Sequence, residues 1–189
     1  MHQAVRLLAR ATAVIGGLVL TGLVLLTTVS IIGRSANKWL HSDFAERTLG
    51  DFARTLIDSG IGEVNGNYEL LEAGIAFAIF SFFPVCQLSR AHATVDIFTS
   101  HLPGAANRAL AAFWEVALTA ALILISVQLF GGVQRYYGNG ETTFFLQFPV
   151  WWAYSASFAA SVVTCIVALW CAYLRVAESL TGRTLMTQE

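Results

Sequence analysis

The chain has 189 residues, of which 56% are hydrophobic and 12% are charged; its formal net charge is −1 and its mean hydropathy is +0.64. An ordinary soluble domain carries roughly a quarter of charged residues, scattered along its whole length. The composition therefore excludes such a domain and predicts a polytopic membrane protein.

Charged residues are absent from four long tracts and crowd into the intervals between them. A helix rises about 1.5 Å per residue, so about 20 apolar residues cross a hydrocarbon core of roughly 30 Å. With their apolar flanks the tracts reach that length, and they predict a single all-α membrane domain over residues 1–189. Its four transmembrane helices are expected at about residues 11–33, 70–89, 112–134 and 150–174.

The first span follows Arg6 and Arg10, an arrangement that also begins a secretory signal peptide. The apolar region of a signal peptide is only about 7–15 residues long, and this one is longer. Arg34, Lys38 and Trp39 anchor its far end, without a clean cleavage site between small residues. We therefore expect the first span to remain attached.

A polar interval separates the first two spans. Asp43 and Glu46 form a capping box, an apolar stripe follows, and Gly60 ends the pattern. These features predict an amphipathic interfacial helix over residues 43–58, on the outer surface. It either covers the bundle or serves as a docking surface for a soluble partner.

The second span begins with Glu69 and Glu72 and contains Pro84 near its end. Negative charge is favoured at a helix N-terminus, which is sufficient to explain the two carboxylates. Proline removes a helical hydrogen bond, so Pro84 predicts a kink.

Small residues recur at three- and four-residue spacing along the fourth span. Such a face allows helix backbones to approach closely in lipid, where no hydrophobic force drives association. The sequence leaves open whether this face packs within the chain or against another protein. Its members are Ala153, Ser157, Ala160, Ser161, Thr164 and Ala168.

Aromatic and basic residues predict the interfaces and the orientation. All five Trp and all five Tyr lie at or near the ends of the uncharged tracts, as amphipathic rings do at headgroup level. The positive-inside rule favours cytoplasmic termini by six basic residues to five. The six are Arg6, Arg10, Arg90, Arg108, Arg175 and Arg183; the five are Arg34, Lys38, Arg47, Arg54 and Arg135.

Residues that carry chemistry are scarce within the membrane. The uncharged tracts lack the carboxylates that proton-coupled pathways need, and all four His lie outside the spans. The three Cys form no C-x-x-C pair, and no phosphate-binding loop or hydrolase motif is present. The sequence therefore predicts no catalytic, metal-binding or cofactor-binding residue, no nucleic-acid partner, and a protein that is not an enzyme.

Three short motifs resemble the small membrane subunit of TRAP transporters, the tripartite ATP-independent periplasmic transporters (DctQ family). An acidic helix start at Tyr68–Glu72 precedes the second span, and the loop Arg90–Asp96 follows it. The stretch Thr142–Tyr154 is similar to the family's entry into its fourth helix. The polar interval before Tyr68 is longer than is usual in that family.

The resemblance implies a scaffold subunit in a bacterial inner membrane. Its partners would be a large transporter membrane subunit, which carries the substrate and ion sites, and indirectly a periplasmic substrate-binding protein that delivers an organic anion. Arg90, His92 and Asp96 would then organise a cytoplasmic loop or contact the partner. Glu69 and Glu72 are further candidates for partner or loop-organising contacts. The alternative for the loop is that Asp96 caps its own helix and Arg90 anchors at the headgroups. The alternative for the whole chain is a free-standing structural or assembly membrane protein.

Overall fold

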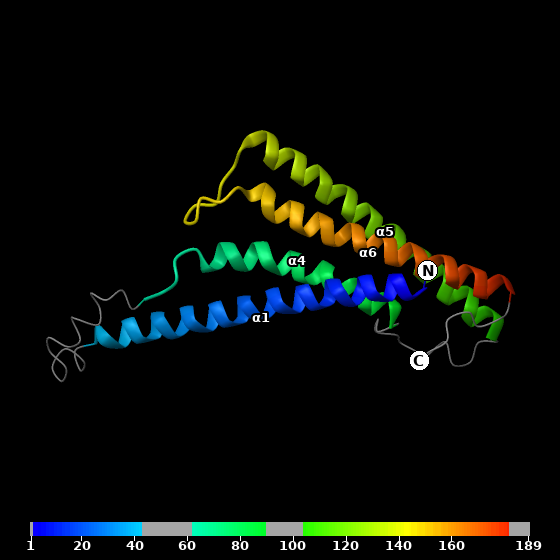
Figure 1. Ribbon diagram of the computed structural model, residues 1–189, viewed down its shortest axis with the longest axis horizontal. Helices are drawn as coiled ribbons and strands as arrows, with labels where there is room; N and C mark the ends of the chain where they lie inside the picture. Colours follow the sequence, from blue (N-terminus) through cyan, green and yellow to red (C-terminus); the bar gives the residue numbers. More distant parts are fainter. Residues whose placement is uncertain (1, 43–61, 90–103, 182–189) are drawn as a thin grey trace.

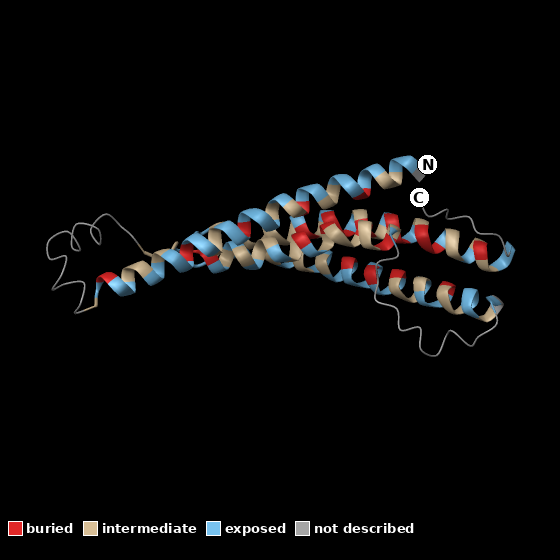
Figure 2. Ribbon diagram, turned by 90° about the horizontal axis from the view of Figure 1, so that it is seen from below, coloured by how far each residue is buried: buried red, intermediate tan, exposed pale blue. Residues whose placement is uncertain are grey.

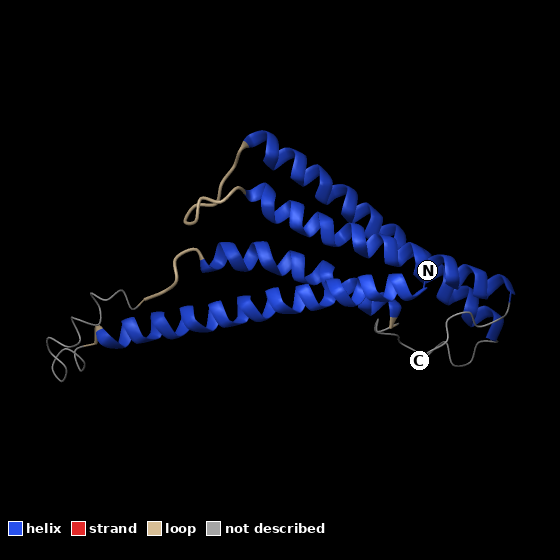
Figure 3. Cartoon of the chain, in the orientation of Figure 1, coloured by secondary structure: helices blue, strands red, loops and turns tan. Residues whose placement is uncertain are grey.

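The computed structural model describes residues 2–42, 62–89 and 104–181, and this part of the chain is helical apart from short connections (Figure 1; Figure 3). The helices are α1 (His2–Leu40), α4 (Asn67–Leu88), α5 (Gly104–Asn139) and α6 (Val150–Thr181). All four are long and apolar enough to cross a membrane, which confirms the expectation of an all-α protein with four spans. The amphipathic helix predicted at 43–58 lies outside the described residues.

The helices form two antiparallel pairs that cross each other. Helix α1 lies beside α4, and α5 lies beside α6; α6 also packs against α4 and so joins the pairs. In Figure 1 the pairs are apart at the end that carries the α5–α6 connection, which we call the hairpin end. Helix α6 is central, because 44% of its most apolar window is buried, against 17% in each of the other three helices. Figure 2 shows the buried residues where helices meet and long exposed stretches on α1.

The face of α1 that packs against α4 and α6 follows a seven-residue repeat. Ala9, Gly16, Leu23 and Ser30 are buried, and the positions between them on the same face are half-buried. A seven-residue repeat is typical of helices that pack as in a coiled coil, where every seventh residue returns to the same side of the helix. We call this buried face of α1 the seam. Small residues on this seam bring the backbones close together: a Cβ built on Gly16 would lie 2.5 Å from the Cβ of Ser81.

Replacing Gly16 by alanine is expected to destabilise the chain by about 1–3 kcal/mol, because the added methyl group overpacks the seam. Gly22 lies on the exposed side of the same helix, and a Cβ there meets nothing within 4 Å. Gly22→Ala is therefore the matched control and is expected to leave stability unchanged or slightly higher. Thermal unfolding of both purified variants in detergent tests this expectation; equal midpoints would contradict the packing of α1 on α4.

Pro84 lies inside α4 and its ring is almost fully buried. The helix continues four residues beyond it, to Leu88. The kink predicted at this position stays a prediction.

Candidate functional site at the junction of the helix pairs

The connection between α5 and α6 is a tight hairpin rather than a free loop. Thr142 and Pro149 form an isolated antiparallel bridge. The Thr143 N–H donates to the Phe148 carbonyl at 3.0 Å, and the Val150 N–H donates to the Glu141 carbonyl at 3.0 Å. We call residues 140–149 the hairpin. At its tip the Phe144 side chain is 84% exposed, so the fold presents an aromatic ring outward.

Glu69 fastens this hairpin to α4. Its Oε1 accepts the backbone N–H of Phe145 at 2.7 Å, and its Oε2 accepts that of Leu146 at 3.0 Å. Hydrogen bonds to a charged acceptor are the stronger kind, and here both carboxylate oxygens are used. Glu69 lies in the first turn of α4, so it links the two helix pairs at the end where they are apart.

Gly66 completes this attachment. It precedes α4 with φ 80°, a left-handed conformation that favours glycine. The Leu146 side chain lies directly over it, because a Cβ on Gly66 would come within 2.5 Å of the Leu146 Cγ. Two contacts therefore hold the hairpin. One is the pair of hydrogen bonds to Glu69, which we call the Glu69 clamp, and the other is the apolar contact of Leu146 with Gly66.

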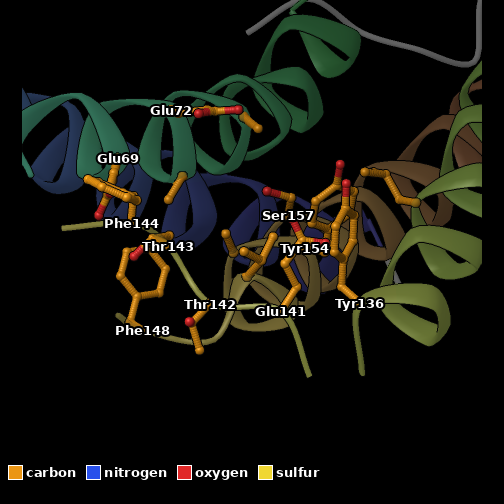
Figure 4. Close-up of a pocket in the computed structure, with 15 residues that line it drawn as sticks. Glu69, Glu72, Tyr136, Glu141, Thr142, Thr143, Phe144, Phe148, Tyr154 and Ser157 are labelled. Atoms are coloured by element: carbon orange, nitrogen blue, oxygen red, sulfur yellow. The ribbon is translucent and has the colours of Figure 1, made fainter. Parts of the chain in front are cut away.

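A cavity of about 560 Å³ lies between the hairpin, α4, α5 and α6 (Figure 4). Among the described residues, three carboxylates line it, from Glu69, Glu72 and Glu141, and no Lys, Arg or His does. On the α5 and α6 side, the rings of Tyr136 and Tyr154 pack against each other with centroids 4.7 Å apart. The cavity therefore combines aromatic walls with negative charge at the hairpin end.

The small-residue face of α6 lies between helices of this same chain. Ser157, Ala160, Ser161, Thr164 and Ala168 are buried, while Ala153 is half-buried and lines the cavity. This face supplies the polar contacts described next.

Three hydrogen bonds made by hydroxyl groups join α6 to its neighbours. The Thr164 hydroxyl donates to the Phe80 carbonyl of α4 at 2.8 Å. The hydroxyls of Ser161 and Ser126 of α5 lie 3.0 Å apart, and the Thr119 hydroxyl of α5 donates to the Ala168 carbonyl at 3.4 Å. Such bonds stabilise helix association where no water competes.

A polar contact near the opposite end of the bundle also joins helices. The Gln87 side-chain amide of α4 donates to the Glu115 carboxylate of α5. Gln87 is 2% exposed and Glu115 is half-buried. In the sequence, both residues lie near the ends of neighbouring spans. That position alone does not predict that they contact each other.

The predicted site residues are only partly assembled. Glu69 and Glu72 are one helical turn apart and line the same cavity, but only Glu69 hydrogen-bonds the hairpin. Arg90, His92 and Asp96 lie outside the described residues. Among the described residues, no group of three or more His, Cys, Asp or Glu could hold a metal ion.

Comparison with known protein families gives a match to a transporter component. The family model of the DctQ component of tripartite ATP-independent periplasmic transporters matches residues 51–179. Those residues include α4, α5 and most of α6, and therefore both the hairpin and the Glu69 clamp. No curated protein and no solved structure matches the chain.

Proposed function

The chain belongs to the DctQ component family of the tripartite ATP-independent periplasmic transporters, and from this membership we propose that it is the non-catalytic small membrane subunit of such a transporter. It scaffolds a large permease subunit in the membrane. The large subunit imports an organic anion, coupled to an ion gradient, after a periplasmic binding protein has delivered it. The family match over residues 51–179 is the observation that carries this proposal.

The hydrogen bonds inside the helix bundle support the proposal of a scaffold role. The buried hydroxyl groups of Thr119 and Thr164 donate to carbonyls of a neighbouring helix, and those of Ser126 and Ser161 bond each other between α5 and α6. Transport pathways through a membrane need ionisable or polar groups that face a shared cavity along the route. The cavity of about 560 Å³ described above lies at the hairpin end.

We place the chain in the bacterial inner membrane with both termini in the cytoplasm. Four spans put the termini on the same side, and the charge count favours the cytoplasm. In this orientation the hairpin and Glu69 face the periplasm. Loop residues Arg90, His92 and Asp96 are then cytoplasmic and available to the large subunit.

Affinity purification from native membranes in a gentle detergent tests the proposal. We expect a large integral membrane protein to be recovered in about stoichiometric amount, because a scaffold subunit must remain bound to what it supports. A tagged four-span protein of another family serves as the control for non-specific recovery. Recovery of the chain alone would contradict the proposal and favour a free-standing structural membrane protein.

A further inference from the structure

One buried hydroxyl group differs from the others inside the helix bundle. Ser157 of α6 is 2% exposed, and its side chain forms no hydrogen bond with a described residue. Every other buried hydroxyl group in the described part of the chain has a partner. These groups belong to Ser30, Ser81, Thr119, Ser126, Ser161 and Thr164. Buried hydroxyl groups are normally hydrogen-bonded, so the exception at Ser157 requires an explanation.

The Ser157 side chain faces the cavity between the hairpin, α4, α5 and α6. It is one of the residues that line this space of about 560 Å³, and Figure 4 shows its hydroxyl oxygen directed away from the α6 backbone. Glu72 of α4 lies across the cavity from it, and Tyr154 lies one turn before it on α6. The Ser157 hydroxyl is therefore accessible to a group that enters the cavity.

Two of the three carboxylates in this cavity have no partner among the described residues. The Glu69 carboxylate accepts hydrogen bonds from two backbone amides of the hairpin, whereas those of Glu72 and Glu141 form no printed ion pair or hydrogen bond within the described part of the chain. Arg135 of α5 is exposed and is not among the described residues that line the cavity. The electrostatic potential inside the cavity is therefore negative, and it attracts cations.

The aromatic wall of the cavity is held in place by close packing on α5. The rings of Tyr136 and Tyr154 have centroids 4.7 Å apart. Gly132 allows the Tyr154 ring to lie against the α5 backbone, because a Cβ built on this glycine would come within 2.6 Å of two ring carbons. Aromatic rings attract a cation within about 6 Å of the ring centroid. The same cavity therefore offers carboxylates and aromatic rings to a cation.

The walls fit an organic cation better than a metal ion. Among the described residues, no three His, Cys, Asp or Glu come together closely enough to hold a metal ion. The cavity has the size of a small-molecule site, which is about 300–1,000 Å³, and much of its wall is apolar. The apolar lining includes Ala73, Ala76, Leu129, Phe148 and Val150. An ammonium group attached to an apolar body matches both the charged and the apolar parts of this wall.

We propose that this cavity binds an organic cation, with the Glu72 carboxylate and the Ser157 hydroxyl as hydrogen-bond acceptors for its ammonium group and Tyr154 packed against it. The ammonium group belongs either to a soluble amine or to the ethanolamine headgroup of a lipid, because tyrosines at the ends of spans lie at headgroup level. The inference goes beyond the proposed function and does not depend on it, since this chain alone supplies every residue of the site.

Calorimetric titration of the purified full-length chain with phenethylamine tests the proposal. Two analogues, 2-phenylethanol and 3-phenylpropionate, have a similar apolar body but carry no charge and a negative charge, respectively. We expect phenethylamine to bind and both analogues to fail, because only the cation forms charge-assisted hydrogen bonds with the acceptors of the cavity. Absence of phenethylamine binding, or equal binding of 2-phenylethanol, would overturn the inference.

Two matched pairs of variants locate the site. Glu72→Gln should weaken phenethylamine binding by about tenfold or more, whereas Glu63→Gln, which removes a carboxylate outside the cavity, should leave it unchanged. Ser157→Ala should weaken binding by about threefold to tenfold and keep the thermal stability, because its hydroxyl has no described partner to lose. Ser161→Ala should do the reverse, since its hydroxyl bonds that of Ser126. Unchanged affinity in both Glu72→Gln and Ser157→Ala would exclude this cavity as the site.

Added lipid distinguishes the two sources of the ammonium group. The titration is repeated after addition of phosphatidylethanolamine or, as the control, of phosphatidylglycerol, which has no ammonium group. Weaker phenethylamine binding in phosphatidylethanolamine alone would support the proposal with the lipid headgroup as the natural occupant. Equal binding in both lipids would support it with a soluble amine as the occupant.

Discussion

Replacing Ala168 by leucine is expected to destabilise the chain by about 3 kcal/mol, the upper end of what overpacking a core usually costs. Ala168 is 0% exposed and sits where α6 meets α5, with its carbonyl accepting the Thr119 hydroxyl at 3.4 Å. The larger side chain has no space there, so the helices must separate and the interhelical bonds lengthen. Thermal unfolding in detergent, followed by loss of the monodisperse species, measures the effect.

Ala159→Leu is the matched control. Ala159 lies in the same helix but is exposed, so leucine there adds apolar surface toward lipid without a clash. Equal unfolding midpoints for the two variants would show that the buried face of α6 is not packed as described.

The same comparison for Ser157→Leu and Ala160→Leu separates the two roles that the sequence left open for this face, which are packing within the chain and packing against another protein. Loss of the partner with the chain still folded would assign that face to the complex rather than to the chain's own core.

Replacing Glu69 by alanine is expected to release the hairpin from α4. The Phe145 and Leu146 amides lose their carboxylate acceptors, whereas the contact of Leu146 over Gly66 remains. Exchange of these two amide hydrogens should become roughly tenfold faster or more, because each now opens without breaking a charge-assisted bond. Hydrogen exchange of the purified chain, read at the hairpin peptides, measures this.

Glu72→Ala is the control for charge alone. Glu72 lines the same cavity and carries the same charge, but no described residue hydrogen-bonds it. We expect its removal to leave hairpin exchange unchanged. If Glu69→Ala also leaves the exchange unchanged, the internal Thr142–Pro149 bridge holds the hairpin and the clamp is incidental.

The four spans and the all-α class were predictable because each follows from local composition. A run of apolar residues long enough to cross the bilayer inserts whichever helices later pack against it. The tracts Ala11–Gly33 and Thr142–Leu174 therefore predict membrane helices from their own composition. The small residues of α6 were found in the same way, since helical periodicity alone places Ser157, Thr164 and Ala168 on one side. Family membership could also be predicted from the sequence, because three short motifs occur in the order that the family shows.

The role of Glu69 was not predictable. A carboxylate in a first helical turn already has a local explanation in the helix dipole, and nothing in the sequence pointed from it to the hairpin. Its acceptors bind amides 76 and 77 residues further along the chain. The buried seam of α1 is a similar case, because the repeat of Ala9, Gly16, Leu23 and Ser30 becomes recognisable only when α4 and α6 are known to pack against it.

The sequence by itself determined which segments enter the membrane, because transfer from water to hydrocarbon depends on the side chains of one segment at a time. Only the tertiary structure decided which helix is central and which faces remain open. That choice depends on how two helix pairs cross, and so on contacts between residues far apart in the chain. Crossing buries the small face of α6, brings Glu69 to the hairpin, and leaves Ser157 of α6 facing the cavity.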